Sequence, residues 1–325
     1  MAPMPPDWRR CPRRAVRGRT YHMTQPAAGP ISHTDFATLP VVARGKVRDI
    51  YRSGDLLLLV ATDRVSAFDV VLPTPIPEKG RVLTELSAHW FRRLADVVPN
   101  HLISIREADF PEAARPYSDL LAGRTMLCRP AERIPVECVV RGHLTGSAWS
   151  EYRAAQTING AAFPAGLREN ARFDEPLFTP TTKADTGHDE KLTWDELVGL
   201  VGGNTAVLLR DVSLRLYQRA SELANAKGIL IADSKLEFGW IDGALTWIDE
   251  AFTPDSSRFW AREDYRLDGT IPSFDKQYLR DYLTESGWNR EPPAPELPAD
   301  VVRTTSDRYV SILQRLIGQD GSAAV

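Results

Sequence analysis

The sequence predicts a two-lobed protein that mixes antiparallel strands with helices. Residues 41–61 show two strand-like runs around a turn, and an amphipathic helix follows at 80–94. A second helix, at 205–227, leads into another pair of strands, at 229–238 and 245–248. The chain has 325 residues, which suits one large domain or two ordinary ones. We therefore expect a first lobe over residues 31–124 and a second lobe over residues 125–325.

Composition and charge exclude several classes of protein. Hydrophobic residues make up 43% and charged residues 26%, as in a soluble globular protein with a sizeable core. The longest aliphatic run, Leu56–Ala61, is far too short to span a bilayer. A net charge of -3 gives no general reason to expect nucleic acid or an anionic membrane as partner. Three cysteines without a CxxC pair argue against zinc or disulfides and favour a reducing cytoplasm, with Cys128 and Cys138 as small core residues.

Residues 1–30 differ in composition from the rest. They are rich in arginine and proline, contain the single acid Asp7, and lack the apolar stretch of a secretory signal. Prolines break up the amphipathic helix that an organelle transit peptide would need. The segment is expected to be a disordered tail, or a non-native extension with Met23 as the true start.

The first lobe is expected to open with an antiparallel hairpin. Strands at 41–52 and 55–61 flank the turn at Ser53-Gly54-Asp55. Near the start of the first strand, Gly45 and Lys46 could bring backbone N–H groups and an ammonium close to phosphate oxygens. The Walker A spacing is absent, so this dipeptide alone is weak evidence for a nucleotide. Leu83, Leu86, Trp90 and Leu94 then form the apolar stripe of a helix.

The second lobe is expected to begin with two strands over residues 125–141. Alternation places Glu137, Val139 and Arg141 on one face of the second strand. That strand runs into 142–147, and a helix follows at 148–155. Arg141 with Ser147 at a helix start suits a phosphate. A serine N-cap beside a surface arginine explains this segment equally well.

A polar loop and several helices complete the predicted elements. Loop 178–190 could be a solvent-exposed lid or a working loop, and His188 lacks partners at metal-ligand spacing. Thr193 and Glu196 form a capping box for a short helix. The helix at 205–227 is expected to bury one face, and further helices are expected at 274–283 and 300–317. The residues of the expected buried face are Leu208, Val212, Leu216, Ala220 and Leu223.

The strand at 229–238 carries the most informative pattern. Alternation aims Asp233, Lys235 and Glu237 in one direction, while the opposite face is apolar throughout. Taken alone, the pattern is better explained by an ordinary half-exposed strand. The continuation favours function, because a second strand after the Asp242-Gly243 turn delivers Asp249 and Glu250. Paired carboxylates beside a lysine suit a magnesium ion on nucleotide phosphates.

The register of this hairpin decides whether two carboxylates share one metal. A two-residue loop at Asp242-Gly243 pairs Glu237 with Ile248 and sends Asp249 to the opposite face. A three-residue loop or a bulge pairs Glu237 with Asp249 instead. We predict the second arrangement.

Six motifs in register resemble the phosphoribosylaminoimidazole-succinocarboxamide synthase (SAICAR synthetase) family over roughly residues 31–317. The motifs are GKVRDIY, ATDRVSAFDVVLPTPIPEKG, PVECVVRGHLTGSAWSEY, FTPTTKADTGHDE, LIADSKLEFGW and DEAFTPDSSRFW. The resemblance implies an α+β fold of two lobes with ATP in the cleft between them, related to ATP-grasp enzymes and protein kinases. It also implies an ATP-dependent ligase of purine biosynthesis. That enzyme joins carboxyaminoimidazole ribonucleotide (CAIR) to L-aspartate through an acyl phosphate and releases ADP and phosphate.

The resemblance also implies the site residues. Gly45, Lys46 and Val47 would hold the ATP phosphates, and Glu237 and Asp249 would bind Mg2+. The residues that it places at the chemistry are Asp233, Lys235 and Lys183. For the CAIR phosphate it assigns Arg141, Ser147 and Arg258. For the CAIR carboxylate or the γ-phosphate it assigns Asp185 with Lys183. It assigns Lys79, Arg280 and Ser66 to substrate without a particular ligand.

Two alternatives use the same nucleotide cleft. A small-molecule kinase explains the magnesium carboxylates but gives no reason for a second anion site at Arg141, Ser147 and Arg258. A non-catalytic nucleotide-binding module would be expected to lack Lys46, Glu237 or Asp249, and all three are present. The implied partners are the small molecules ATP, CAIR and L-aspartate, with no nucleic acid or membrane, in a cytoplasmic monomer or small homo-oligomer.

Overall fold

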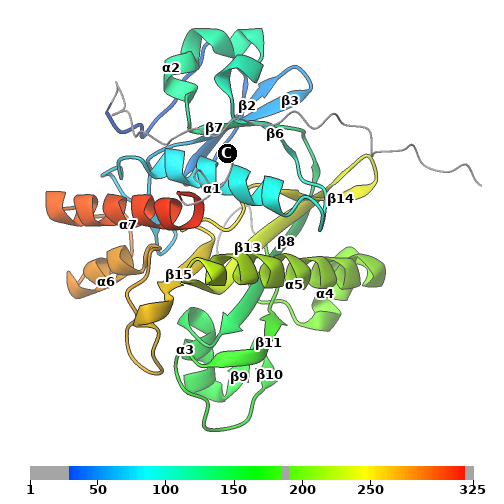
Figure 1. Cartoon of the computed structure of the whole chain (residues 1–325), viewed down its shortest axis with the longest axis vertical. Coiled ribbons are helices and arrows are strands. Elements are labelled where there is room, and N and C mark those ends of the chain that lie inside the picture. Colours follow the sequence, from blue (N-terminus) through cyan, green and yellow to red (C-terminus); the bar gives the residue numbers. More distant parts are fainter. Residues whose placement is uncertain (1–28, 184–189, 319–325) are drawn as a thin grey trace, which may run out of the picture.

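Two antiparallel sheets form the framework of the molecule. The computed structural model describes residues 29–183 and 190–318 (Figure 1). The predictions for residues 1–28 and for Asp185 and His188 therefore lie outside the described residues. In Figure 1 the first sheet stands above the second, with α1 (Lys79–Arg93) between them.

The first sheet has five strands in the order β1-β2-β3-β7-β6. Ser53 pairs with Leu56, so the predicted hairpin is confirmed, with Gly54 at φ 60° in its two-residue turn. The predicted boundary at residue 124 falls just before β7, which pairs with β3, so the chain leaves this sheet only after Cys128. The strands are β1 (Val41–Arg44), β2 (Arg48–Ser53), β3 (Leu56–Ala61), β6 (Leu102–Ser104) and β7 (Thr125–Cys128).

The second sheet has the path β11-β8-β13-β14, with β12 also on β8 and β15 also on β13. Its two long central strands are β8 (Glu132–His143) and β13 (Ile229–Ile241), which lie side by side. The remaining strands are β11 (Arg172–Phe178), β12 (Thr181–Thr182), β14 (Ala244–Ile248) and β15 (Ser257–Ala261). Two small hairpins lie outside the sheets: β4 (Ser66–Ala67) with β5 (Val70–Val71), and β9 (Thr157–Ile158) with β10 (Ala161–Ala162).

The helices confirm most of the sequence expectations. The four apolar residues of the predicted α1 stripe are buried, and Thr193 with Glu196 forms the capping box of α4 (Trp194–Val201). In α5 (Gly203–Ala226) the predicted face is partly wrong, because Leu208 is exposed while Leu209 is buried. Residues four positions apart differ in direction by about 40° around the helix axis, so a face defined by four-residue steps turns gradually away from the core. The other helices are α2 (Ser118–Leu121), α3 (Gly146–Ala155), α6 (Gln277–Glu285) and α7 (Ala299–Ile317).

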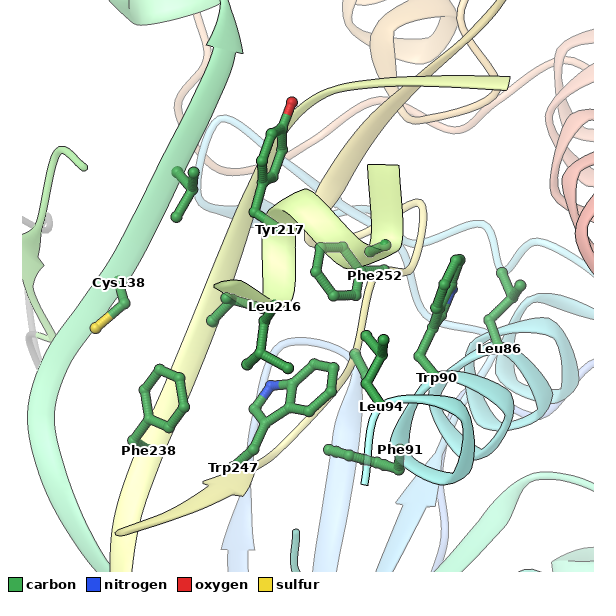
Figure 2. Packing of buried hydrophobic residues seen from close by; sticks show 14 of the residues in the cluster. Leu86, Trp90, Phe91, Leu94, Cys138, Leu216, Tyr217, Phe238, Trp247 and Phe252 are labelled. Atoms are coloured by element: carbon green, nitrogen blue, oxygen red, sulfur yellow. The ribbon is translucent and has the colours of Figure 1, made fainter. Parts of the chain in front are cut away.

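A single aromatic cluster joins α1 to the second sheet. The ring centroids of Phe91 and Trp247 lie 4.8 Å apart, and those of Trp90 and Phe252 lie 5.5 Å apart (Figure 2). Backbone bonds reinforce this contact, since Trp247 N–H donates to the Pro99 carbonyl at 2.9 Å. Helix α1 and the segment that follows it are thus packed against the strand that precedes Asp249.

Cys128 and Cys138 are free thiols and fully buried, which confirms them as core residues. Within residues 29–183 and 190–318, no single helix is long and apolar enough to span a membrane. The only candidate there by length and composition is the pair α4–α5, which is bent by 117°.

Candidate functional site

Polar side chains gather along one face of the paired strands β8 and β13. Asp233 lies opposite Arg141, and Glu237 lies opposite Glu137. Lys235 lies between them, opposite Val139. Because side chains alternate between faces every residue, these groups project to the same side of the sheet. From Asp233 to Glu237 the face extends over four residue-to-residue steps of strand, a length of roughly 14 Å.

At the Asp233 end, two arginines converge on one carboxylate. Arg141 Nη1 lies 3.2 Å from Asp233 Oδ2, and Arg258 forms an ion pair with the same oxygen. Arg141 also donates to Ser147 Oγ at 3.2 Å and to Thr179 Oγ1 at 3.0 Å. The Asp233 carboxylate raises the pKa of Arg258, so this guanidinium stays charged. Two largely buried cations around one anion leave a net positive charge that suits a phosphate.

Helix α3 begins beside these arginines. Thr145 at its N-cap makes no side-chain capping bond in the described chain. Gly146 has φ 58°, and a Cβ built there would lie 2.5 Å from Arg258 Nη2. Glycine is therefore required both for the left-handed conformation and for the close approach of Arg258. The amide N–H groups of the first turn of α3 add to the positive field at this end.

At the Glu237 end, lysines and glutamates form a connected network. Lys183 Nζ contacts Glu137 Oε1 at 2.8 Å and Glu237 Oε1 at 2.6 Å, and Lys235 Nζ contacts Glu137 Oε2 at 2.6 Å. Burial raises the pKa of Glu237, the neighbouring Asp249 raises it further, and Lys183 opposes both. Burial and the Asp249 carboxylate both disfavour the charged form of Glu237, so a cation bound beside these two carboxylates would stabilise it.

The predicted hairpin register is wrong. Glu237 pairs with Ile248 and Ile241 pairs with Ala244, so the loop is the two-residue turn Asp242-Gly243. Both turn residues have positive φ, 51° and 75°, which is the conformation that an Asp-Gly pair favours in tight hairpins. Asp249 still influences the pKa of Glu237, because it leaves the strand with φ 63° instead of continuing the alternation.

Asp249 is held in place by an arginine of the first lobe. Arg48 Nη1 lies 3.0 Å from Asp249 Oδ1, and its Nη2 lies 2.7 Å from Glu250 Oε2. Burial acts to lower the pKa of Arg48, but these two carboxylates outweigh it and raise the pKa. Arg48 thereby ties β2 to the end of β14.

The loop at Gly45, Lys46 and Val47 lies between β1 and β2 and is firmly braced. Arg64 donates to the carbonyls of Gly45 at 3.0 Å and Lys46 at 3.2 Å, and Thr62 N–H donates to the Val47 carbonyl at 2.9 Å. Lys46 Nζ reaches Asp69 Oδ1, and both side chains are about half exposed. This loop therefore presents an accessible ammonium from a fixed backbone.

A cavity of about 290 Å³ lies against part of the polar face of β8 and β13. Its lining joins Asp69, in the turn between β4 and β5, to Lys235, Arg141 and Ser147. The cavity is large enough for the reacting part of a small-molecule substrate. Its lining residues are Asp69, Val139, Arg141, Ser147, Ala148, Glu151, Ile158, Asn159, Thr179, Thr181, Lys191 and Lys235.

Three sequence-predicted residues belong neither to this cavity lining nor to the groups of side chains described above. Lys79 is fully buried and paired with Asp255 at 2.7 Å. Arg280 lies on α6 with its Nη1 4.0 Å from Asp275, which also influences the pKa of Arg258. Ser66 lies half-buried in the β4–β5 hairpin that carries Asp69.

Two residues were missed by the sequence reasoning. Glu137 shares a strand face with Arg141, and that alternation could have identified it. Arg48 follows Lys46 by two residues. Its partners Asp249 and Glu250 lie far along the chain, and Asp249 is 201 residues from Arg48. Only the tertiary structure brings that pair together.

The donor set for a metal is small. No group of three or more His, Cys, Asp or Glu side chains in a metal-binding arrangement occurs among residues 29–183 and 190–318. Glu237 and Asp249 nevertheless fit Mg2+, which usually takes one or two protein carboxylates and completes its octahedron with water and phosphate oxygens. The influence of Asp249 on the pKa of Glu237 supports this fit, because it places the two carboxylates close to each other.

Comparisons with known proteins agree on one family. The family described as SAICAR synthetase matches residues 41–295. A Pelobacter propionicus protein named phosphoribosylaminoimidazole-succinocarboxamide synthase is 53% identical over 290 residues, covering 89% of this chain and 98% of the relative. A protein of the same name from Desulfosudis oleivorans is 53% identical over 289 residues, covering 89% and 99%. The solved SAICAR synthase of Saccharomyces cerevisiae, complexed with SAICAR, is similar with TM-score 0.81 and 39% identity, covering 89% of this chain and 98% of that one.

Proposed function

The chain belongs to the SAICAR synthetase family, and we propose that it joins CAIR to L-aspartate with ATP, giving SAICAR, ADP and phosphate. The observation that carries this proposal is the polar face of β8 and β13. It bears an arginine pair for a phosphate at one end and a lysine–carboxylate network at the other. The relatives give no support to a small-molecule kinase or to a non-catalytic nucleotide-binding module.

The CAIR phosphate would bind at the Asp233 end. Arg141, Arg258 and Ser147 surround a position that the N-terminus of α3 also faces. Asp233 holds both guanidinium groups in place before substrate arrives, which lowers the entropy cost of binding. The aminoimidazole ring and its carboxylate would then extend along the strand face towards Lys235 and Lys183.

ATP would bind between the two sheets, as in ATP-grasp enzymes and protein kinases. Gly45, Lys46 and Val47 would meet its phosphates from above, while Glu237 and Asp249 would hold Mg2+ below. When bound, Mg2+ neutralises phosphate charge and orients the transferred group.

The chemistry requires positive charge where two anions meet. The CAIR carboxylate attacks the γ-phosphorus of ATP, the bond from that phosphorus to the ADP oxygen breaks, and an acyl phosphate forms. The aspartate amine then attacks the acyl carbon and phosphate leaves. Lys183 and Lys235 would stabilise the charge that builds up on the transferred group. Glu137 contacts both ammonium groups and would fix their directions.

The remaining expectations are also proposals. ATP, CAIR and L-aspartate would be the partners, without nucleic acid or membrane, and the protein would work in the cytoplasm as a monomer or small homo-oligomer. We assign the phosphate-binding loop to the N-terminal lobe, and the magnesium and CAIR sites to the C-terminal lobe.

A reaction with purified protein tests the function. ATP, Mg2+, CAIR and L-aspartate together should yield SAICAR and ADP in equal amounts, and omission of L-aspartate should stop ADP release after at most one turnover. Steady ADP release without L-aspartate would indicate a kinase. Absence of turnover under all conditions would indicate a binding module.

A further inference from the structure

The segment Asp249–Arg258 connects the two ends of the proposed site. At its start, Asp249 lies against Arg48 and influences Glu237. At its end, Arg258 pairs with Asp233. We refer to these ten residues as the connecting segment.

Several bonds fasten the connecting segment to β13. Lys235 N–H donates to the Ser256 carbonyl at 2.8 Å, and Ser257 Oγ donates to Ser234 Oγ at 2.8 Å. Within the segment, Thr253 N–H donates to Ser256 Oγ at 3.1 Å. These bonds fix the stretch from Thr253 to Arg258 against β13, so the position of Asp255 bears on the position of Arg258.

A buried ionic cluster holds the middle of the connecting segment. Asp255 Oδ2 lies 2.7 Å from Lys79 Nζ and 3.1 Å from Lys276 Nζ, and Tyr309 Oη donates to Asp255 Oδ1 at 2.7 Å. All four side chains are buried, with Lys79 and Tyr309 at 0% exposure and the Asp255 side chain at 3%. They come from the first residue of α1, the residue before α6, the connecting segment and α7, so three helices meet at one carboxylate.

The charge balance of this cluster argues against a purely stabilising role. Two ammonium groups surround one carboxylate, and burial lowers the pKa of Lys79 to about 8, with Asp255 opposing and Lys276 adding to the decrease. Buried ion pairs of this kind give little net stability compared with apolar side chains of similar volume. What they do supply is a fixed geometry, because each bond is directional and short.

Helix α7, which carries Tyr309, and the segment that precedes it are themselves anchored on the first lobe. Ser306 Oγ of α7 donates to the Pro77 carbonyl at 2.8 Å, and Leu297 N–H donates to Thr74 Oγ1 at 2.9 Å. The cluster therefore relates the connecting segment to the first lobe as well as to the C-terminal helices.

We propose that Asp255, Lys79, Lys276 and Tyr309 form a positioning centre that sets Arg258 for the substrate phosphate. Through this centre the C-terminal helices α6 and α7 contribute to substrate binding, although neither lines the cavity between the lobes. The inference rests on the proposed function for the identity of the ligand, CAIR. It assigns the four residues a role through Arg258 and no direct contact with the reacting atoms.

Two tyrosine variants separate positioning from stability. Tyr309→Phe removes one hydroxyl donor and keeps the buried ring. Tyr265→Phe is the matched control, since it removes one hydroxyl bond of 3.0 Å to the Asn170 carbonyl, which involves none of the four cluster residues. Calorimetry with CAIR in the absence of ATP should show a Kd raised roughly tenfold for Tyr309→Phe, because slight misplacement of a contact has large effects. Tyr265→Phe should stay within about twofold of wild type.

A double variant tests the route through Arg258. If Tyr309 acts on CAIR only by placing Arg258, Tyr309→Phe should have no further effect on the Kd in an Arg258→Ala background. Lys276→Gln, which leaves the Lys79–Asp255 pair intact, should resemble Tyr309→Phe and serves if that variant folds poorly.

Three outcomes would overturn the positioning centre. One is an unchanged Kd for both Tyr309→Phe and Lys276→Gln, another is equal weakening in Tyr265→Phe, and the third is full additivity with Arg258→Ala. Failure of the wild-type protein to turn over CAIR, L-aspartate and ATP would count instead against the proposed function.

Discussion

Arg141 offers the sharpest test of the proposed phosphate site. Its side chain is 12% exposed and makes three polar contacts, with Asp233 at 3.2 Å, Ser147 at 3.2 Å and Thr179 at 3.0 Å. Arg141→Ala removes a directional cation while leaving the second arginine, Arg258, on the same carboxylate. The folded protein should therefore survive the substitution, since Asp233 keeps a partner.

The structure narrows the expected loss of affinity. Truncating one member of a buried, charge-paired contact costs about 2–5 kcal/mol in binding. Because Arg258 and the start of α3 remain, we expect the lower part of this range, about 2–3 kcal/mol. That loss corresponds to a Kd for CAIR that rises roughly 30- to 150-fold.

Calorimetric titration with CAIR measures this Kd directly. Arg168→Ala is the control, because Arg168 is 57% exposed and pairs only at the surface with Asp268 among the ion pairs of the described chain. Its Kd should match wild type. An Arg141→Ala protein that is folded and binds CAIR as tightly as wild type would remove Arg141 from the site and refute the assignment of this end of the strand face.

Three further predictions concern other parts of the site. Glu237→Gln should lower kcat by roughly 100-fold or more. Calorimetry should show its CAIR affinity within about threefold of wild type. An equal loss of kcat and of CAIR affinity would mean that the carboxylate is misassigned. Gly146→Ala should weaken CAIR binding and lower the free energy of unfolding, measured in urea titrations, by about 1–2 kcal/mol. The reason is that residue 146 has a left-handed backbone and its new Cβ would meet Arg258. An unchanged CAIR affinity together with an unchanged free energy of unfolding would contradict the close approach of Arg258. Burial acts to raise the pKa of Glu151, but hydrogen bonds from Lys191 and from backbone N–H groups outweigh it and lower the pKa from 4.5 to about 2. The Glu151 carboxylate therefore stabilises the fold above about pH 4.5, and its contribution is lost as the pH falls towards 2. Glu151→Gln should flatten that part of the curve of unfolding free energy against pH. An identical curve would show that the bonds to Glu151 do not persist in solution.

Local sequence patterns predicted the elements well, because each depends on neighbours. The stripe from Leu83 to Leu94 and the Thr193 capping box describe interactions within one helix, and both are present. The alternation in β13 likewise placed Asp233, Lys235 and Glu237 on one face correctly, since alternation follows from extended backbone alone.

The hairpin register failed for a reason that is also local. The prediction chose the loop that would bring Glu237 and Asp249 together, and so let function decide the turn. The Asp242-Gly243 pair decides it instead, because both residues accept positive φ at little cost. The carboxylates approach by a different route, the left-handed backbone of Asp249, which no sequence pattern here indicated.

Contacts between distant segments were beyond the sequence. Arg48 with Asp249 and Lys79 with Asp255 are 201 and 176 residues apart. A lysine at a helix start and an arginine in a strand read as surface charges unless their partners are known. The carboxylates that pair with them are identified only by the tertiary structure.

The pairing of β8 with β13 has a consequence for how this protein tolerates change in length. A single-residue insertion within either strand would turn the charged groups beyond it into the apolar core and bring apolar side chains into the cavity. An insertion of two residues would restore the faces but displace one end of the site from the other by roughly 7 Å. Variation in length among descendants of this sequence should therefore collect in the loops between strands, while β8 and β13 keep their spacing residue for residue.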